Sequence, residues 1–163
     1  MSKNEFGRIA IIGAGPGGLT LARILQLKGV EVKIYERETS IDVRSQGGTL
    51  DLHVESGQHA LQTAELFDKF QALCRPEGQD MRIIDKSGKV YYEEISQEPN
   101  FDRPEIDRGD LRQILLESLK ANTIAQGHAL QNIESLDNGQ HKLVFNNGVT
   151  ETADLVIGAD GAW

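Results

Sequence analysis

Three glycines at a fixed spacing are the residues of this chain best suited to hold a ligand. Gly13, Gly15 and Gly18 form the pattern G-x-G-x-x-G directly after the apolar run 8–12. In this pattern the first glycine allows a tight turn, the second lets backbone approach a pyrophosphate, and the third lets a helix pack closely on a strand. The spacing predicts a dinucleotide site at a helix N-terminus. A plain glycine-rich turn is the alternative in a chain of 17 glycines.

An acidic residue, Glu36, follows the motif at the distance expected for a ribose ligand, about 20 residues on. It comes directly after the alternating run 30–35. A carboxylate there accepts hydrogen bonds from both hydroxyls of an adenosine ribose and repels a 2′-phosphate. This favours FAD or NAD over NADP at this position, with a solvated acid at a strand end as the alternative.

The elements around the motif have the order of a β-α-β unit. Residues 8–12 and 30–35 predict strands, and the apolar residues of 19–27 have helical spacing between them. Gly29 is a helix stop signal. The helix is therefore predicted to be the crossover between two parallel strands.

After Glu36 the sequence does not predict a second α/β crossover. A polar loop is expected over 38–48, and the chain closes with the apolar strand 153–159 and Asp160–Gly161. The unbroken apolar character of that strand predicts a place in the middle of a covered parallel sheet. Between them we expect a helix over 54–70, a hairpin from 81–85 and 89–92, a loop over 94–103, a helix over 109–120 and strands over 128–136, 141–145 and 149–152.

Composition and charge exclude several classes of protein. The 163 residues fit one domain, or one domain with part of a second, and 39% hydrophobic content is ordinary for a globular chain. The net charge of −8 argues against nucleic acid or an anionic membrane as a partner. The single cysteine, Cys74, excludes an intramolecular disulfide, and we expect no leader peptide and no membrane span. A cytoplasmic protein is expected, with no metal site because the four histidines lack ligand spacing.

Five segments of the sequence match a known family pattern. They are IIGAGPGGLTLA (11–22), VEVKIYERE (30–38), RSQGGTLDLH (44–53), FDRPEIDRGDLRQILLESL (101–119) and ETADLVIGADGAW (151–163). On these segments the chain resembles the single-component (class A) FAD-dependent monooxygenases, most of all the tetracycline-inactivating flavin monooxygenases. The resemblance covers nearly the whole chain and is loosest over 67–97.

The resemblance implies both a fold and a set of cofactor-binding residues. The implied fold is a Rossmann-like α/β FAD-binding domain of glutathione-reductase type, with a parallel sheet and a β-meander. Residues 1–163 would be its N-terminal part, and 80–93 would belong to a partial substrate-domain sheet. The implied residues are Gly13, Gly15 and Gly18 at the pyrophosphate, Glu36 at the ribose with Arg37 beside it, Asp51 by the flavin, Arg108 on FAD, Arg112 on its adenosine–phosphate side, Arg44 in NADPH binding, and Asp160–Gly161 at both nucleotides.

For four of these positions the residues alone leave a local alternative. Arg108 and Arg112 are four apart and repel each other on a helix unless they share an anion. Asp51 could be a turn or cap residue, and Arg44 could be a solvated loop charge. The two arginines on the helix could instead pair with the neighbouring acids Glu105, Asp107 and Asp110.

The implied activity is that of an oxidoreductase. NADPH or NADH, as a transient reductant, reduces FAD, and O2 is then used to hydroxylate an aromatic or polyketide-like small molecule, with tetracycline and antibiotic resistance as the specific expectation. Because the flavin carries the chemistry, no catalytic residue is named. Two other functions stay open: a fragment of an NAD-dependent dehydrogenase, and a truncated, non-catalytic dinucleotide-binding module.

Members of that family are more than twice this length. We therefore expect this chain to hold the ADP half of the FAD site and part of the flavin site. A chain lacking the remaining strands and helices is expected to be inactive alone. It is also expected to self-associate through exposed apolar surface.

Overall fold

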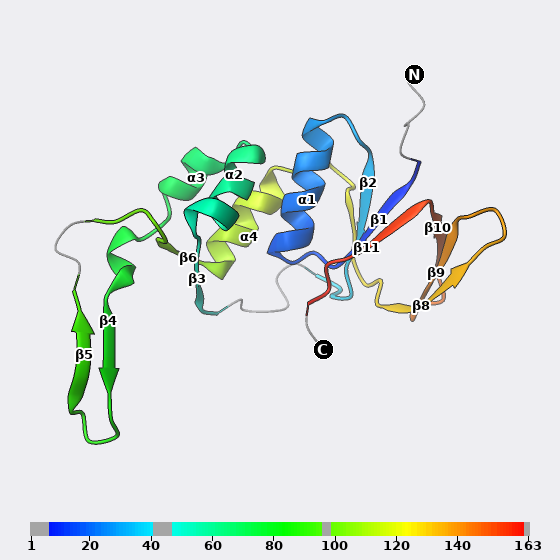
Figure 1. Ribbon diagram of the computed structural model, residues 1–163. Coiled ribbons are helices and arrows are strands. Elements are labelled where there is room, and N and C mark those ends of the chain that lie inside the picture. The colour runs from blue at the N-terminus through cyan, green and yellow to red at the C-terminus, as the bar shows by residue number, and fades with distance from the viewer. Residues whose placement is uncertain (1–6, 41–46, 96–98, 162–163) are drawn as a thin grey trace. The chain divides into compact units, whose positions relative to one another are not determined.

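The computed structural model describes residues 7–40, 47–95 and 99–161, and the chain divides into two compact units (Figure 1). The first unit comprises Met1–Ser45 and Arg112–Trp163, and the second comprises Gln46–Leu111. Each unit has its own buried apolar side chains, and each is described by itself. In the described ranges, every helix is too short or too polar to cross a bilayer.

A parallel four-stranded sheet forms the centre of the first unit. Its order is β11 (Leu155–Gly158), β1 (Ile9–Ile12), β2 (Val32–Tyr35) and β7 (Ile124–Ala125). The helix α1 (Pro16–Leu27) crosses over from β1 to β2, which confirms the predicted β-α-β unit.

The end of α1 follows the stop signal read from the sequence. Gly29 has a φ of 76° and donates its N–H to the Gln26 carbonyl at 3.1 Å. The Val30 N–H donates to the Leu25 carbonyl at 2.9 Å. This pair of bonds is a Schellman motif, whose left-handed residue is glycine because it lacks a Cβ.

An antiparallel meander packs against one face of the parallel sheet. Its order is β10 (Thr150–Ala153), β9 (His141–Phe145) and β8 (Leu130–Ser135). The Tyr35 and Phe145 rings lie 4.7 Å apart between centroids. Because side chains alternate along a strand, residues on the other face of β1 are left for the helical layer. The buried cluster under the meander contains Ala10, Ile12, Tyr35, Leu143, Phe145 and Ala153.

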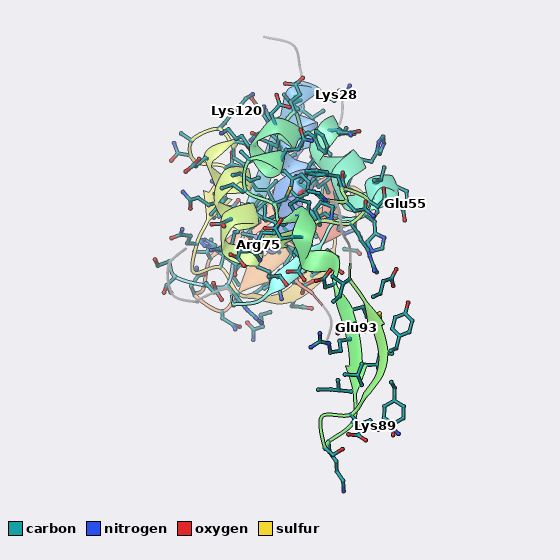
Figure 2. The ribbon with its side chains drawn as sticks, turned by 90° about the vertical axis from the view of Figure 1, so that its left-hand side faces the viewer. Lys28, Glu55, Arg75, Lys89, Glu93 and Lys120 are labelled. Atoms are coloured by element: carbon teal, nitrogen blue, oxygen red, sulfur yellow. The ribbon has the colours of Figure 1, made fainter. Side chains whose placement is uncertain are left out.

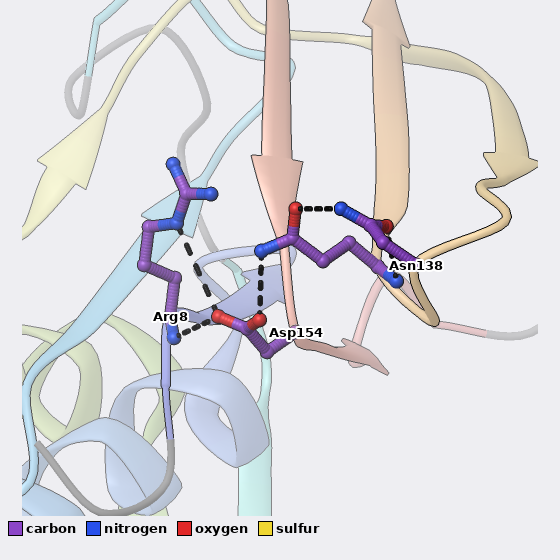
Figure 3. A network of polar contacts seen from close by, with 4 residues as sticks. Arg8, Asn138 and Asp154 are labelled. Atoms are coloured by element: carbon purple, nitrogen blue, oxygen red, sulfur yellow. Dashed lines mark hydrogen bonds and ion pairs between the residues drawn. The ribbon is translucent and has the colours of Figure 1, made fainter.

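A polar network joins the start of β1 to the meander (Figure 3). The Asp154 carboxylate accepts the Arg8 backbone N–H at 2.6 Å and the Gln140 side-chain amide at 2.8 Å. Asn138 donates to the Gln140 amide oxygen at 2.9 Å. The network connects three segments that are far apart in sequence.

The strand β11 differs from its expected place in the sheet. It pairs with β1 and lies at one edge of the sheet formed by the described strands, with β7 at the other edge. Leu155 is 47% exposed, whereas Val156 packs against the meander cluster. The expectation of a central strand was therefore wrong. An apolar run reports which faces are covered and does not distinguish an edge from a centre.

The second unit combines short helices with two small antiparallel ladders. Buried residues include Leu61, Phe70 and Ile106. The Gln58 side-chain amide donates to the Leu52 carbonyl at 2.7 Å and the Phe101 carbonyl at 2.8 Å, which joins two loops. The elements are β3 (Thr49–Asp51), paired with β6 (Glu105–Asp107), a π-helical turn (Val54–Gln58), α2 (His59–Thr63), α3 (Phe67–Gln71), a 3₁₀ turn (Pro76–Gln79), the hairpin β4 (Met81–Ile84) and β5 (Val90–Glu94), and the start of α4 (Arg108–Glu117).

The single helix expected over 54–70 is broken in the structure. Glu65 has a φ of 58°, and the Leu66 N–H donates to the Leu61 carbonyl at 2.9 Å. This is a second Schellman ending, with a glutamate in the position that usually holds glycine. Leu61 and Leu66 are both buried, so tertiary packing decides the break against the helical spacing.

The predicted hairpin forms, and its apolar side chains are exposed. Lys89 lies near its tip, and Glu93 lies on β5 (Figure 2). Glu93 forms an ion pair with Arg82 on β4. Ile84 is 55% exposed and Tyr91 is 64% exposed. Such a two-stranded ladder has too little cover to be stable by itself.

Candidate functional site

The glycine turn between β1 and α1 is shaped by a close approach of backbone. Gly13 has a φ of 107°, and a Cβ on it would lie 2.5 Å from the Ala159 carbonyl oxygen. On Gly18 a Cβ would lie 2.2 Å from the Gly13 carbonyl oxygen. These contacts leave room only for glycine, so the first and third glycines of the motif are required by the fold itself.

Gly15 differs from its two neighbours in the motif. It is the N-terminal cap of α1 with a φ of −76°, and the nearest atom to a Cβ there would be the Ala159 carbonyl oxygen at 3.9 Å. Alanine would therefore fit the protein at this position. A Cβ at Gly15 would make only an ordinary van der Waals contact, so the protein does not crowd this backbone, as a pyrophosphate needs in order to approach it.

The first turn of α1 is suited to an anion. Pro16 occupies the first helical position, the first turn contains no acidic residue, and no side chain caps it. Backbone N–H groups at this end carry partial positive charge. A diphosphate is the kind of ligand that such a helix end stabilises.

The Glu36 carboxylate is held next to the glycine turn. Its Oε2 accepts the Ala14 backbone N–H at 2.7 Å, and its Oε1 accepts the Glu38 backbone N–H at 3.0 Å. The Gly13 N–H donates to the Tyr35 carbonyl at 2.9 Å, which keeps β2 beside the turn. Each carboxylate oxygen keeps a second lone pair for a ribose hydroxyl.

The end of β11 forms a wall of the same site. The Ala159 N–H donates to the Ile12 carbonyl at 2.7 Å, and its carbonyl oxygen faces Gly13. Asp160 follows it and is exposed. Ala159 was not among the expected site residues, because a backbone contact gives no signal in residue type. All of these groups gather at the carboxyl ends of the parallel strands, where ligands of such sheets bind.

The other expected site residues lie in several places. Arg37 is exposed beside Glu36, and Arg112 is 6% exposed on α4. Asp51 and Arg108 are exposed and belong to the second unit. Arg44 lies outside the described residues.

Pairing of Arg108 with Asp107, one of the local alternatives, is opposed by Arg75, which was not among the expected site residues. Asp107 accepts two hydrogen bonds from Arg75, from Nη1 to Oδ2 at 3.0 Å and from Nη2 to Oδ1 at 3.1 Å. These bonds lower the pKa of the Asp107 carboxyl. Arg75 and Asp107 are far apart in sequence, and spacing gave no signal of this pair.

The sheet, the crossover helix and the glycine turn define a dinucleotide-binding α/β domain, and the uncrowded backbone at Gly15 with the Glu36 carboxylate fits the ADP half of a flavin dinucleotide. The chain belongs to the FAD binding domain family, whose pattern it matches over residues 8–163.

Known proteins of this family are similar along nearly the whole chain. The monooxygenase penA of Penicillium thymicola is 33% identical over 175 aligned residues, which cover 100% of this chain and 40% of that protein. The 3-amino-4-hydroxybenzoate 2-monooxygenase of Streptomyces cremeus is 32% identical and is covered to 39%. The crystal structure of the tetracycline destructase Tet(55) is 30% identical, with a TM-score of 0.73 over 94% of this chain and 38% of that one. The chain thus spans about 40% of the curated relatives it matches.

Proposed function

We propose that this chain is the N-terminal FAD-binding portion of an NAD(P)H- and O2-dependent flavin monooxygenase that hydroxylates an aromatic or polyketide-like small molecule. The observation that carries the proposal is the Glu36 carboxylate bonded to the Ala14 N–H beside a glycine turn whose backbone is uncrowded at Gly15. The names of the relatives, which include a hydroxybenzoate monooxygenase and a tetracycline destructase, support the reaction class.

In this proposal the residues of the first unit bind the cofactor's ADP half. The N–H groups at the start of α1 receive the pyrophosphate, with Gly15 giving the close approach. Glu36 accepts the ribose hydroxyls, and its negative charge selects against a 2′-phosphate. Arg37 and Arg112 add positive charge to the phosphate side.

The remaining assignments concern the flavin and the reductant. Asp51 lies by the flavin, Arg108 binds an anionic group of FAD, and Arg44 takes part in binding NADPH. The bound flavin supplies electron transfer from the nicotinamide and oxygen chemistry. The chain's residues bind and orient the cofactor, and we name no acid, base or nucleophile among them.

The substrate and the setting of the protein complete the proposal. A tetracycline-type polyketide is the substrate to test first, with resistance to that antibiotic as the biological role. The exposed hairpin over 80–93 is assigned to a partial substrate-domain sheet. The net charge and the lone Cys74 support a cytoplasmic protein whose partners are small molecules and O2, and not nucleic acid or a membrane.

The test is the visible absorption spectrum of the purified chain before and after addition of FAD, with the released cofactor identified. A protein-bound flavin spectrum supports the proposal. A folded chain that takes up NAD and never FAD would support a dehydrogenase fragment instead. A folded chain that binds neither contradicts FAD binding by this portion. Oxidation of NADPH coupled to O2 uptake, measured on a chain that includes the rest of the relatives' length, tests the reaction itself.

A further inference from the structure

The acid directly before α4 is occupied by a long-range partner. Asp107 is the last residue of β6, and Arg108 is the first residue of α4. Both Asp107 oxygens are taken by the two terminal nitrogens of Arg75, at 3.0 and 3.1 Å. This two-point geometry is the strongest that an arginine and a carboxylate form.

Arg75 is itself held in place by the strand that carries Asp107. Its backbone N–H donates to the Glu105 carbonyl at 2.7 Å, and its carbonyl accepts the Glu105 N–H at 3.2 Å. The Glu105 carboxylate also lies 3.8 Å from Nη2 of Arg75. The guanidinium is therefore aligned by a backbone bridge as well as by charge. The hydrogen bond to Asp107 is the main cause of the raised pKa of Arg75.

Arg108 has a different environment although it adjoins the same acid. Its backbone N–H donates to the Gly48 carbonyl at 3.1 Å, which joins the start of α4 to the segment before β3. Its side chain is exposed, and within the described ranges it makes no hydrogen bond or ion pair. The charge of Asp107 is thus neutralised by Arg75, and the charge of Arg108 is left for another anion.

We propose that Arg75 is a positioning residue for the cofactor: by holding Asp107 it prevents that acid from neutralising Arg108 and leaves Arg108 to an anionic group of FAD. This inference rests on the proposed function. The proposed role of Arg75 differs from a purely structural role in one testable respect. If Arg75 acts by neutralising Asp107, removal of the Asp107 charge must compensate for the loss of Arg75.

The test is a rescue experiment on FAD binding. The dissociation constant for FAD is measured by flavin fluorescence titration at low ionic strength for the wild-type chain, Arg75→Gln, Asp107→Asn and the double variant. We expect Arg75→Gln to weaken binding about 10-fold, because an unpaired carboxylate then competes for Arg108. Asp107→Asn is expected to stay within about 2-fold of wild type, and the double variant within about 3-fold.

Two further variants control for folding and for charge. Arg82→Gln breaks the ion pair with Glu93 in the same unit and makes the same change in net charge, and it is expected to leave FAD binding unchanged. Arg75→Lys keeps the charge and loses the two-point geometry, so it is expected to fall between wild type and Arg75→Gln. It replaces Arg75→Gln if that variant does not fold. Circular dichroism and thermal melting report the folding of each variant.

The results for the variants test the role of Arg75, and the result for the wild-type chain tests FAD binding itself. An Arg75→Gln chain that binds FAD as wild type does, or a double variant that binds no better than Arg75→Gln, would overturn the role of Arg75 and leave FAD binding standing. A folded wild-type chain that binds no FAD removes the proposed function, and the role of Arg75 falls with it. Recovery of binding in the double variant supports both.

Discussion

The backbone N–H of Ala14 donates a hydrogen bond of 2.7 Å to the Oε2 atom of Glu36. The bond joins the glycine turn after β1 to the acid after β2. It presents the carboxylate at the turn while the second oxygen is held by the Glu38 N–H. Glu36 therefore keeps the turn in place, and in the proposed function it also receives the ribose; substitutions can separate these two roles.

Glu36→Gln is expected to keep the hydrogen bond from Ala14, because the side-chain amide oxygen still accepts it, and to lose the bond from the Glu38 N–H, because the amide NH2 group cannot accept. It loses the charge-assisted bonds to the ribose, which are worth about 1.5–3 kcal/mol. We therefore expect FAD affinity to fall about 10-fold or more, with a smaller fall in thermal midpoint than in Glu36→Ala, which loses both backbone hydrogen bonds. Glu36→Ala should lose affinity and also stability, by about 1–3 kcal/mol, since the Ala14 N–H is left without its acceptor. Flavin titration and thermal melting measure the two effects, and equal affinities for Glu36→Gln and wild type would contradict the ribose assignment.

Gly15→Ala and Gly18→Ala are expected to act in opposite ways. An alanine at Gly15 fits the protein but occupies the space of the pyrophosphate, so FAD affinity should fall about 10-fold with the thermal midpoint kept. An alanine at Gly18 meets the Gly13 carbonyl, so unfolding should become easier by about 1–3 kcal/mol. Gly17→Ala is the matched control for stability, because its Cβ would meet nothing within 4 Å and alanine favours the helix. Loss of stability in Gly15→Ala would show that this position is structural.

Tyr35 gives a prediction at high pH. Burial, with a smaller contribution from Glu151, raises the pKa of its phenol to about 12. The unfolded chain releases this proton near pH 10, so the folded state is favoured below pH 10 and loses this stability as the pH rises to about 12. The contribution is on the order of 2 kcal/mol. Denaturant unfolding of wild type and Tyr35→Phe between pH 9 and about 12 checks it: the stability of wild type should fall more steeply than that of Tyr35→Phe, and parallel curves would contradict the assignment.

Asp154 gives the corresponding prediction in acid. Its pKa is lowered, first by the hydrogen bond from the Arg8 backbone N–H and then by the bond from Gln140. A lowered pKa contributes stability above the ordinary carboxyl pKa, and this stability is lost as the pH falls through the folded value. Asp154→Asn should therefore be less stable than wild type at pH 7, and the difference should shrink below about pH 4. Urea unfolding at pH 7 and pH 3 measures it, with Asp137→Asn in the neighbouring turn as a control for loss of one charge.

The exposed hairpin predicts self-association of the isolated chain. Ile84, Val90 and Tyr91 are each at least 46% exposed, and uncovered apolar strands are sites of association. Sedimentation velocity should show species larger than a monomer that increase with concentration. Ile84→Lys should reduce them, whereas Lys86→Gln at the turn should not. A monomer at all concentrations would show that this surface is tolerated in water.

Much of the first unit could be predicted from the sequence because its signals are local. The spacing of the glycine motif and of the acid after it identified Gly13, Gly18 and Glu36. Gly29 ends α1 because its positive φ suits a residue without a Cβ. The hairpin was located by a glycine turn between two apolar runs. Each of these features depends on residues that are neighbours along the chain, and periodicity and turn chemistry record such neighbours.

Other features were decided by the tertiary structure. Helical spacing over 54–70 gave no sign of the break at Glu65, which is stabilised by the packing of Leu61 and Leu66. The apolar run of β11 did not reveal that it is an outer strand.

The partners of individual polar groups were also beyond the sequence. Spacing placed Asp107 beside Arg108, whereas the fold pairs it with Arg75, which is 32 residues away. The wall that Ala159 forms against Gly13 is likewise a contact between opposite ends of the chain. Residue types and spacing determine which chemistry is available and which local turns form. Only the folded chain decides which charges meet, because long-range pairing depends on how distant strands are brought together.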